Sequence, residues 1–393
     1  MPPREPALVN PALLRWGREG VRLSLAEAAT RLKVKEIDLR AWETGEGKPS
    51  VPQLRKLASL YRRPIAVFYL GEPPGEEDLL FAFRRLPEHE EREVSYDLAL
   101  ELRFANGRRE VALELAREAD QLPEPFGGRA KTSEGVPAVA RRLRELLGVT
   151  LEEQEGWQQP YAALGAWRQA LERQGILTFQ ASLSREEMRG FSIVHERFPL
   201  VTVNTKDSPR ARCFSLLHEL THLALGSGAL CGSEEERGED TPDPTERFCN
   251  AVAAVMLVPE EALDRSPGIP RAGARAASLE ADQIKRLCDR FQASEEVVLR
   301  RLAETGRISG RFLQQEIRRL RSSPPPKQQS GPVPVFRKVI SSLGATYVRT
   351  VLSAHAADRI TLSQVATYLG TRLKHLPKIE QAAWASGGRK ASV

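Results

Sequence analysis

His218-Glu219-Leu220-Thr221-His222 lies within residues 214–225, whose apolar pattern predicts a helix. Four residues are about one helical turn, so both imidazoles project from the same face. This spacing lets two neutral ring nitrogens bind one Zn²⁺, and it places Glu219 beside the open position of the metal. A carboxylate there can take a proton from water and pass it to a leaving amine. The motif therefore predicts metal-assisted hydrolysis, with a peptide bond as the favoured substrate.

A second interpretation fits the same residues: a buried amphipathic helix whose histidines bond to the backbone, since short motifs also arise by chance. A catalytic zinc site needs a third protein ligand. After a loop at residues 226–245, the segment 246–259 becomes apolar and helical. Glu246 begins that helix, so it is a candidate ligand, but it could equally be an acid stabilised by a helix N-terminus. Spacing alone leaves both open.

The segments around the two helices resemble the ImmA/IrrE family of metallopeptidases. The resemblance rests on residues 212–222 and 246–254. Upstream, residues 189–194 and 199–204 look like the strand pair that precedes the zinc helix of that family. The resemblance covers the middle of the chain and implies a small zincin-like core with a short sheet.

The resemblance also implies roles for individual residues. His218, His222 and Glu246 would bind Zn²⁺, and Glu219 would be the general base. Asn250 is a candidate for orienting a ligand, because metal ligands usually need a hydrogen-bonded partner. A buried amide bonded to the backbone is an equally good interpretation of Asn250.

Other polar residues near the motif are weaker candidates. His195 precedes the second predicted strand and could donate to an oxyanion, although a loop histidine is more often a surface residue. The four cysteines are scattered without a C-x-x-C pair, which is typical of reduced, buried thiols in a cytoplasmic protein. Cys231 and Cys249 lie near the predicted zinc, so we considered a redox-reactive thiol, with inert packing as the alternative.

The N-terminal segment has the pattern of a helix-turn-helix. Ser24 caps a helix that starts at Leu25, and Glu27 completes a capping box. A short turn at residues 33–34 leads to a second short helix, and further helices flank the pair. The segment resembles the Xre/Cro/C1 family of DNA-binding domains. The resemblance implies a five-helix domain that binds double-stranded operator DNA.

The recognition helix of that family would fall on residues 35–42. We expect its DNA-facing residues to be Lys35, Glu36, Asp38, Leu39 and Arg40. Ile37 and Trp42 are expected to pack inward. The two acids oppose the phosphate charge, although an acid can accept a hydrogen bond from cytosine. The alternative is a helical module that docks the peptidase or a partner protein.

Charge is distributed unevenly along the 393 residues, whose net charge is +6. Residues 1–75 hold 13 Lys and Arg against 8 Asp and Glu, and residues 326–393 hold 10 against 2. Basic ends around an acidic centre place any nucleic-acid contact at the ends. No apolar run is long enough to span a bilayer and no apolar leader precedes the chain, so we expect a cytoplasmic protein without membrane contact.

These patterns predict a mainly α protein with a small α+β catalytic unit. No long-period internal repeat was found in the sequence. The C-terminal module has a basic face that suits either nucleic-acid binding or assembly, and we favour assembly. The predicted organisation is a helix-turn-helix domain at 1–75, a helical connector at 76–157, a metallopeptidase domain at 158–321, a Pro/Ser linker at 322–333 and a basic helical module at 334–393.

The leading hypothesis for function is a regulatory zinc endopeptidase fused to a DNA-binding head. The family resemblance implies that it cleaves a repressor or antitoxin-like protein in a stress, phage or toxin–antitoxin setting. The first alternative is a ligand-sensing regulator whose peptidase-like domain is a sensor or structural module. The second is a structural partner in a toxin–antitoxin pair, and a homodimer is also left open.

Overall fold

The protein is described here by a computed structural model that covers residues 5–74, 95–185, 187–227, 230–231, 244–322, 331 and 333–385. The chain divides into two compact units, residues 1–104 and 105–393, and α6 (Tyr96–Glu118) crosses the boundary. Most of the predicted linker at 322–333 lies outside the described residues. Within the described ranges, every helix is too short or too polar to cross a bilayer.

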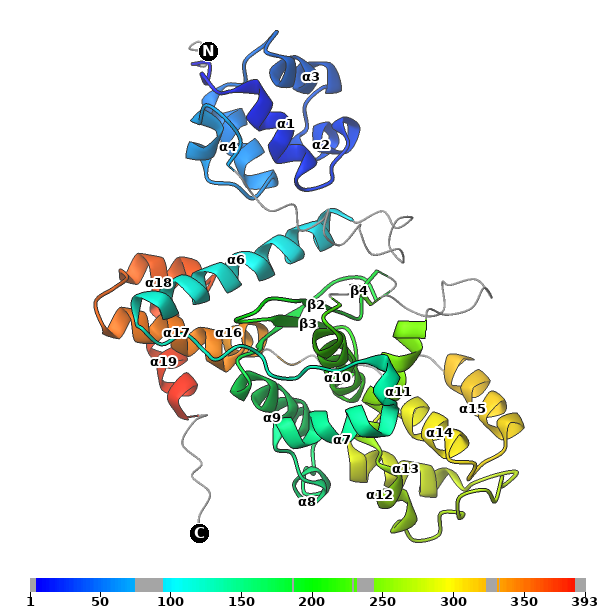
Figure 1. Ribbon diagram of the computed structural model, residues 1–393. Coiled ribbons are helices and arrows are strands. Elements are labelled where there is room, and N and C mark those ends of the chain that lie inside the picture. The colour runs from blue at the N-terminus through cyan, green and yellow to red at the C-terminus, as the bar shows by residue number, and fades with distance from the viewer. Residues whose placement is uncertain are drawn as a thin grey trace. The chain divides into compact units, whose positions relative to one another are not determined.

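The first unit is a cluster of short helices (Figure 1). The Ser24 hydroxyl accepts a hydrogen bond from the Glu27 N–H, and the Glu27 carboxylate accepts one from the Ser24 N–H, which confirms the predicted capping box. A turn in which Lys33 adopts φ 57° connects the second helix to the third. The elements are α1 (Pro11–Glu19), α2 (Leu25–Leu32), α3 (Glu36–Thr44), α4 (Val51–Leu60), η1 (Ile65–Tyr69) and the start of α6.

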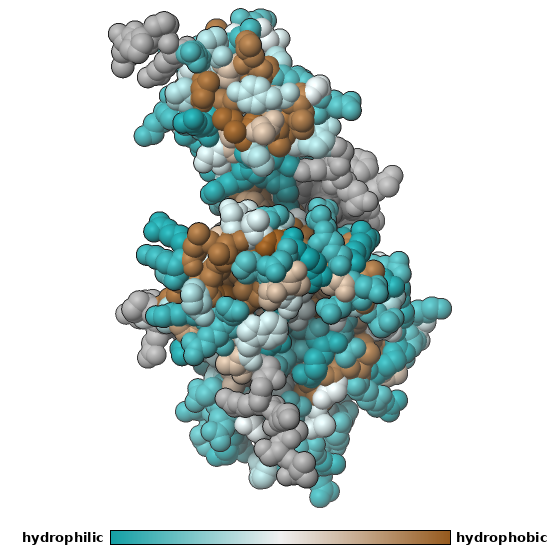
Figure 2. All heavy atoms as spheres, turned by 90° about the vertical axis from the view of Figure 1, so that its left-hand side faces the viewer, coloured by the Kyte–Doolittle hydropathy of each residue, from teal (hydrophilic) through white to brown (hydrophobic). Residues whose placement is uncertain are grey.

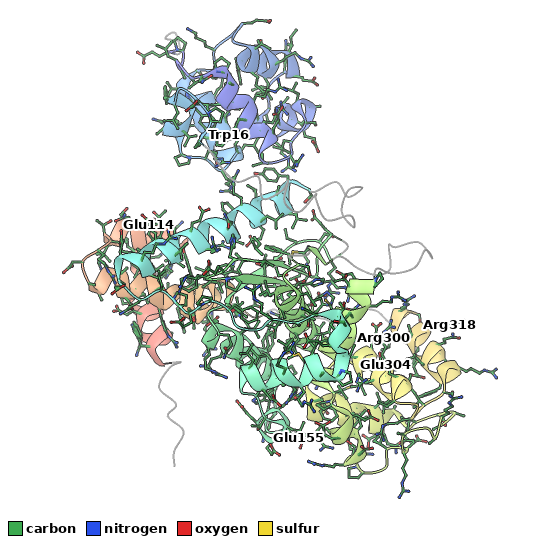
Figure 3. All side chains as sticks on the ribbon, in the orientation of Figure 1. Trp16, Glu114, Glu155, Arg300, Glu304 and Arg318 are labelled. Atoms are coloured by element: carbon green, nitrogen blue, oxygen red, sulfur yellow. The ribbon has the colours of Figure 1, made fainter. Side chains whose placement is uncertain are left out.

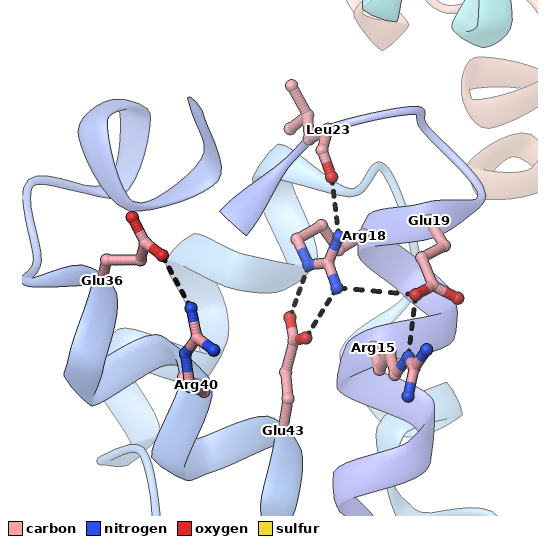
Figure 4. Close-up of polar contacts among 7 residues, drawn as sticks. All are labelled: Arg15, Arg18, Glu19, Leu23, Glu36, Arg40 and Glu43. Atoms are coloured by element: carbon pink, nitrogen blue, oxygen red, sulfur yellow. Dashed lines mark hydrogen bonds and ion pairs between the residues drawn. The ribbon is translucent and has the colours of Figure 1, made fainter. Parts of the chain in front are cut away.

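A buried ion pair joins α1 to α3 in this unit (Figure 4). Arg18 donates from Nε and Nη2 to the two carboxylate oxygens of Glu43, each at 2.8 Å. The hydrogen bond to Glu43 raises the pKa of Arg18, so the guanidinium stays charged in the interior. Trp16, labelled in Figure 3, also lies on α1, and the Arg63 guanidinium sits 4.1 Å from its ring centroid.

The second unit is also mainly helical, with one small sheet, as the sequence predicts. Its helices before and inside the catalytic region are η3 (Thr132–Glu134), α7 (Val136–Leu147), α8 (Leu151–Glu155), α9 (Pro160–Arg173), α10 (Pro209–Leu225), α11 (Pro244–Leu257), α12 (Glu260–Asp264), α13 (Ala281–Phe291), α14 (Glu295–Glu304) and α15 (Gly310–Ser322). The C-terminal helices are α16 (Val335–Leu343), α17 (Ala345–Ala356), α18 (Leu362–Tyr368), η5 (Leu373–His375) and α19 (Leu376–Ala385).

The sheet has the strand order β1-β3-β2-β4. β1 and β3 are parallel, while β2 is antiparallel to both β3 and β4. The strands are β1 (Leu177–Ala181), β2 (Gly190–Ile193), β3 (Leu200–Asn204) and β4 (Leu230–Cys231). β1, β2 and β3 are buried throughout. This confirms the three strands that the sequence predicts and adds a short fourth strand after α10.

The largest hydrophobic core surrounds α10. It joins residues of α9, α10, α11, α13 and α14 with the inner face of the sheet. α7, which the sequence assigned to a connector, contributes Val139, Leu143 and Leu147 to the same core. On the other face of the sheet, the Phe179 ring meets the Tyr347 ring at 6.0 Å between centroids. α10 is therefore held on several sides, which fixes the residues it carries.

The C-terminal helices pack against β1 and α9 (Figure 1). Glu172 of α9 links β1 to α17. One of its carboxylate oxygens accepts from the Thr178 hydroxyl of β1 at 2.6 Å, and the other accepts from the Thr346 N–H of α17 at 3.0 Å. The second bond caps the N-terminus of α17 with a negative charge. Gly344, at φ 76° and ψ 152°, makes the turn into α17 directly beside this carboxylate.

Replacing Gly344 by Ala should destabilise the second unit by about 3 kcal/mol, because the backbone conformation suits glycine alone and the new methyl group would clash. An added Cβ would lie 2.6 Å from Glu172 Oε1 and 2.7 Å from the Thr178 carbonyl oxygen. Gly310→Ala is the matched control, since nothing lies within 4 Å of its Cβ position. Denaturant unfolding of the two variants measures the difference, and equal midpoints would contradict this packing.

Candidate functional site

α10 presents its two histidines from adjacent turns. Ser208 caps the helix by accepting from the Ala211 N–H, and Pro209 occupies its first turn. The His218 and His222 rings lie 4.8 Å apart between centroids, and their Nε2 atoms are 3.0 Å apart. Both side chains are buried. The helix thus aims two imidazole nitrogens at one point inside the protein.

α11 brings the third group to that point. Glu246 lies in the first turn of α11, and its carboxylate faces both histidines. Its Oε1 lies 3.1 Å from His222 Nε2, and its Oε2 lies 3.4 Å from His218 Nε2. These three residues form a candidate metal-binding group whose donor atoms all lie within 4.8 Å of one another. The structure therefore brings together the three predicted ligands from two helices.

The spacing of these donors fits a tetrahedral zinc ion. Zinc bonds to nitrogen and carboxylate oxygen of about 2.0–2.2 Å place neighbouring ligand atoms about 3.3 Å apart. The three separations here are 3.0, 3.1 and 3.4 Å. Two imidazoles and one carboxylate leave the fourth position for water or substrate, as in catalytic rather than structural zinc sites.

The carboxylate of Glu246 is held in its ionised form. Burial by itself would raise its pKa, but hydrogen bonds from His218 and His222 outweigh burial and lower it. A buried anion between two imidazoles is the charge state that a metal ligand needs. This arrangement explains why an acid is tolerated at a position that is 5% exposed.

Glu219 occupies the space between α10 and β2. Its side chain is fully buried, and it lies against Gly190 at the start of β2. A Cβ at position 190 would be 3.0 Å from Glu219 Oε1 and 3.2 Å from the Thr202 carbonyl oxygen. A glycine at this position leaves room for the carboxylate, because any side chain would have to displace it or the strand by a few tenths of an ångström. Gly190 is a site residue that our sequence reasoning missed, although a glycine inside a strand pattern is a known sign of close approach.

The remaining candidates near the motif lie in different places. Asn250 is half-buried one helical turn after Glu246, and its orienting role stays a prediction. Cys213 and Cys249 are fully buried, and burial raises the pKa of the Cys213 thiol to about 12, so that thiol is unreactive. The side chain of Cys231 lies outside the described residues.

His195 is not brought to the metal-binding group. It follows the end of β2 opposite to Gly190, and three residues of strand separate those ends by about 10 Å. Burial, assisted by the charge of Arg109, lowers the pKa of His195 to about 4. The histidine is therefore neutral at physiological pH and lies against α6, so the structure gives no support to an oxyanion role.

The exposed face of α3 differs from the predicted one. Lys35, Glu36, Asp38 and Arg40 are exposed, as expected of DNA-facing residues. The predictions for Leu39 and Ile37 are wrong: Leu39 is 0% exposed in the core, and Ile37 is 70% exposed. Trp42 is buried, as predicted.

Helix geometry explains the reversal. Ile37 and Trp42 are five positions apart in the sequence, which places them about 140° apart around the helix axis. They therefore cannot share the inner face. Leu39 and Trp42 are three residues apart and lie about 60° from each other. The exposed set on this helix therefore lacks Leu39 and includes Ile37.

Comparison with known proteins supports a peptidase-like domain. Residues 171–303 match the model of the M78 peptidase family, which is described as the IrrE N-terminal-like domain. The match covers about a third of the chain and includes β1 to β4, α10, α11 and all three proposed ligands. A search of curated proteins found no match. The family match and the metal-binding group agree on a metallopeptidase-like domain.

Replacing Glu246 by Gln should lower the affinity for zinc at least about tenfold, because the amide loses the charge while it keeps the shape. Glu260→Gln, an exposed acid on α12, is the control and should not change the affinity. Competition with a chromophoric chelator measures both values. Equal affinity in the two variants would remove Glu246 from the ligand set.

Proposed function

We propose that the second unit is a zinc-dependent endopeptidase. The observation that carries the proposal is the buried group of His218, His222 and Glu246, with donor atoms spaced as a tetrahedral zinc requires. The M78 family match around these residues supports a peptide bond as the target. Zinc is the proposed ion because the His-Glu-x-x-His spacing on α10, with a carboxylate from a second helix, is the ligand set of zinc peptidases, and the M78 match surrounds it.

A bound zinc ion would polarise the scissile carbonyl and lower the pKa of a water molecule at the site. Glu219 then takes a proton from the attacking water and passes it to the leaving amine. Its side chain is fully buried beside Gly190, and this packing orients the carboxylate and keeps bulk water away from it. The Glu246 carboxylate lies within 3.4 Å of the Nε2 atoms of both histidines, so all three side chains face one point where they would hold the ion.

We further propose that this activity is regulatory and that the first unit is a helix-turn-helix domain that binds operator DNA. The support is local: α2 and α3 are joined by a three-residue turn, and α3 exposes Lys35, Ile37 and Arg40. A peptidase linked to a DNA-binding domain would act in the cytoplasm on a protein that controls transcription. A repressor or an antitoxin is the proposed substrate class.

Glu219→Gln should abolish peptide cleavage while zinc stays bound, because Gln cannot move a proton but fills the same space. The loss should be about 100-fold or more. A mixed peptide library, incubated with the full zinc-loaded chain and analysed by mass spectrometry, measures cleavage, and Glu260→Gln serves as control. A zinc-loaded parent chain that cleaves nothing would favour the ligand-sensing alternative. Cleavage that is unchanged by Glu219→Gln would refute the assigned base.

Arg40→Gln should weaken binding of the chain to operator DNA several-fold, because one phosphate contact is lost. The slope of log affinity against log salt concentration should fall in magnitude by about 1. Arg15→Gln is a matched control, since both arginines are exposed and each pairs with a glutamate four residues away, at 3.0 Å for Arg40 and 2.8 Å for Arg15 (Figure 4). Fluorescence anisotropy across salt concentrations measures the slope. Equal slopes for the two variants would argue that α3 does not face DNA.

A further inference from the structure

The segment after α17 repeats the local structure of α2 and α3. Residues 361–380 align with residues 24–43 without gaps, at a constant difference of 337 in residue number. Each copy contains a helix of seven or eight residues, a tight turn and a second helix. The correspondence extends to individual hydrogen bonds, backbone angles and buried positions.

The first helix of each copy begins with the same capping box. In the first copy, the Ser24 N–H donates to Glu27 at 2.9 Å, and the Glu27 N–H donates to the Ser24 hydroxyl at 3.2 Å. In the second copy, the Thr361 N–H donates to Gln364 at 2.8 Å, and the Gln364 N–H donates to the Thr361 hydroxyl at 3.3 Å. The same two reciprocal hydrogen bonds therefore occur at equivalent positions of both copies, and both helices begin with the same cap geometry.

The turns also agree. Lys33 and Gly370 occupy equivalent positions and adopt φ values of 57° and 59°, the left-handed region that ends a helix. Two residues later, Lys35 and Arg372 are both extended, with ψ values of 144° and 145°. The chain therefore leaves the first helix and enters the second in the same direction in both copies.

The preceding helix takes part in the repeat as well. Arg18 of α1 donates from Nη1 to the carbonyl oxygen of Leu23, which precedes the N-cap of the first copy. His355 of α17 lies 3.0 Å through Nδ1 from the carbonyl oxygen of Ile360, which precedes the N-cap of the second copy. Each copy is thus a three-helix arrangement in which a side chain of the first helix holds the entry to the second.

The buried positions coincide. Equivalent residues fill the small core of each copy, and all are 7% exposed or less. The pairs are Ala28 and Val365, Leu32 and Leu369, Leu39 and Leu376, and Trp42 and Ile379.

The two copies share few identical residues, which explains why the sequence alone did not show the repeat. Only six of the twenty aligned positions are identical, and most of those are common helix residues. The identities are Leu25 and Leu362, Ala29 and Ala366, Thr30 and Thr367, Leu32 and Leu369, Leu39 and Leu376, and Glu43 and Glu380.

The exposed faces of the second helices differ in charge. In the first copy, two basic residues are offset by Glu36 and Asp38. In the second copy, the corresponding stretch from 372 to 378 has no acid, and Arg372, Lys374 and Lys378 are all exposed. Leu373 is exposed beside them, at 53%. Figure 2 looks at the side of the second unit on which α17 to α19 lie and shows hydrophilic and apolar side chains together on this surface.

We propose that residues 345–385 form a second helix-turn-helix that binds double-stranded DNA. Arg372, Lys374 and Lys378 are exposed on the segment that would enter the major groove, and they complement the phosphate backbone. The exposed acid Glu380 follows them on α19, so the cations outnumber the acids there by three to one. The exposed Leu373 at the start of that helix suits apolar contact with a thymine methyl group. By charge, this second copy supplies more phosphate attraction than the first copy, whose exposed acids oppose it.

The test measures binding of the full chain to a labelled mixed-sequence duplex of about three helical turns, over about 50 to 200 mM salt. Replacing Lys374 and Lys378 by Gln removes two exposed charges from the second copy. The slope of log affinity against log salt should fall in magnitude by about 1.8, and affinity at low salt should fall about tenfold or more. The matched control replaces Lys285 and Lys338, two exposed lysines outside the repeat, and should leave the slope unchanged.

The outcomes separate this proposal from the function proposed above. The loss caused by the Lys374 and Lys378 changes should persist when Arg40→Gln is also present, because the two copies bind independently. A slope equal to that of the control would overturn the proposal, as would a parent chain that does not bind the duplex. A change in sedimentation without a change in slope would also overturn it, and would assign the basic face to assembly between proteins.

Discussion

The packing of α11 against α10 is the interaction on which the metal-binding group of this protein depends. It places an ionised carboxylate between two buried imidazoles, an arrangement that is costly unless a cation or protons compensate the charge. Neither helix can move by a fraction of a turn without separating the three donor atoms. The large core around α10 and the sheet beside it hold this geometry in place before any ligand binds.

The sheet contributes space as well as support. Gly190 begins β2 at the point where Glu219 approaches the strand, so a missing side chain on one element makes room for a functional side chain on another. At one edge of the sheet, β1 is covered by the C-terminal helices, and the Glu172 carboxylate of α9 joins Thr178 of β1 to the start of α17. An otherwise exposed strand edge is thereby protected from pairing with other chains.

The sequence was sufficient for the elements with strong local signals. The zinc helix, the helix of Glu246, three of the strands and the capping box at Ser24 follow from periodicity, motif spacing and cap residues. The exposure of Ile37 and the burial of Leu39 also follow from local geometry, because the angle to Trp42 places Leu39, and not Ile37, on the same face as Trp42. The position of His195 is different, since it depends on the direction of β2, which the sequence does not give. The similarity between residues 24–43 and 361–380 lies in backbone angles and hydrogen bonds more than in residue identities, so the sequence does not reveal it.

The most direct test of the central claim is X-ray absorption at the zinc edge on the purified full chain. We expect one zinc per chain with two imidazole nitrogens and oxygen ligands at about 2.0–2.2 Å, and no sulfur. Cys249 lies three residues after Glu246 on α11, so a thiolate ligand is a competing chemistry that this measurement distinguishes. A sulfur shell at about 2.3 Å, or the absence of stoichiometric zinc, would contradict the account.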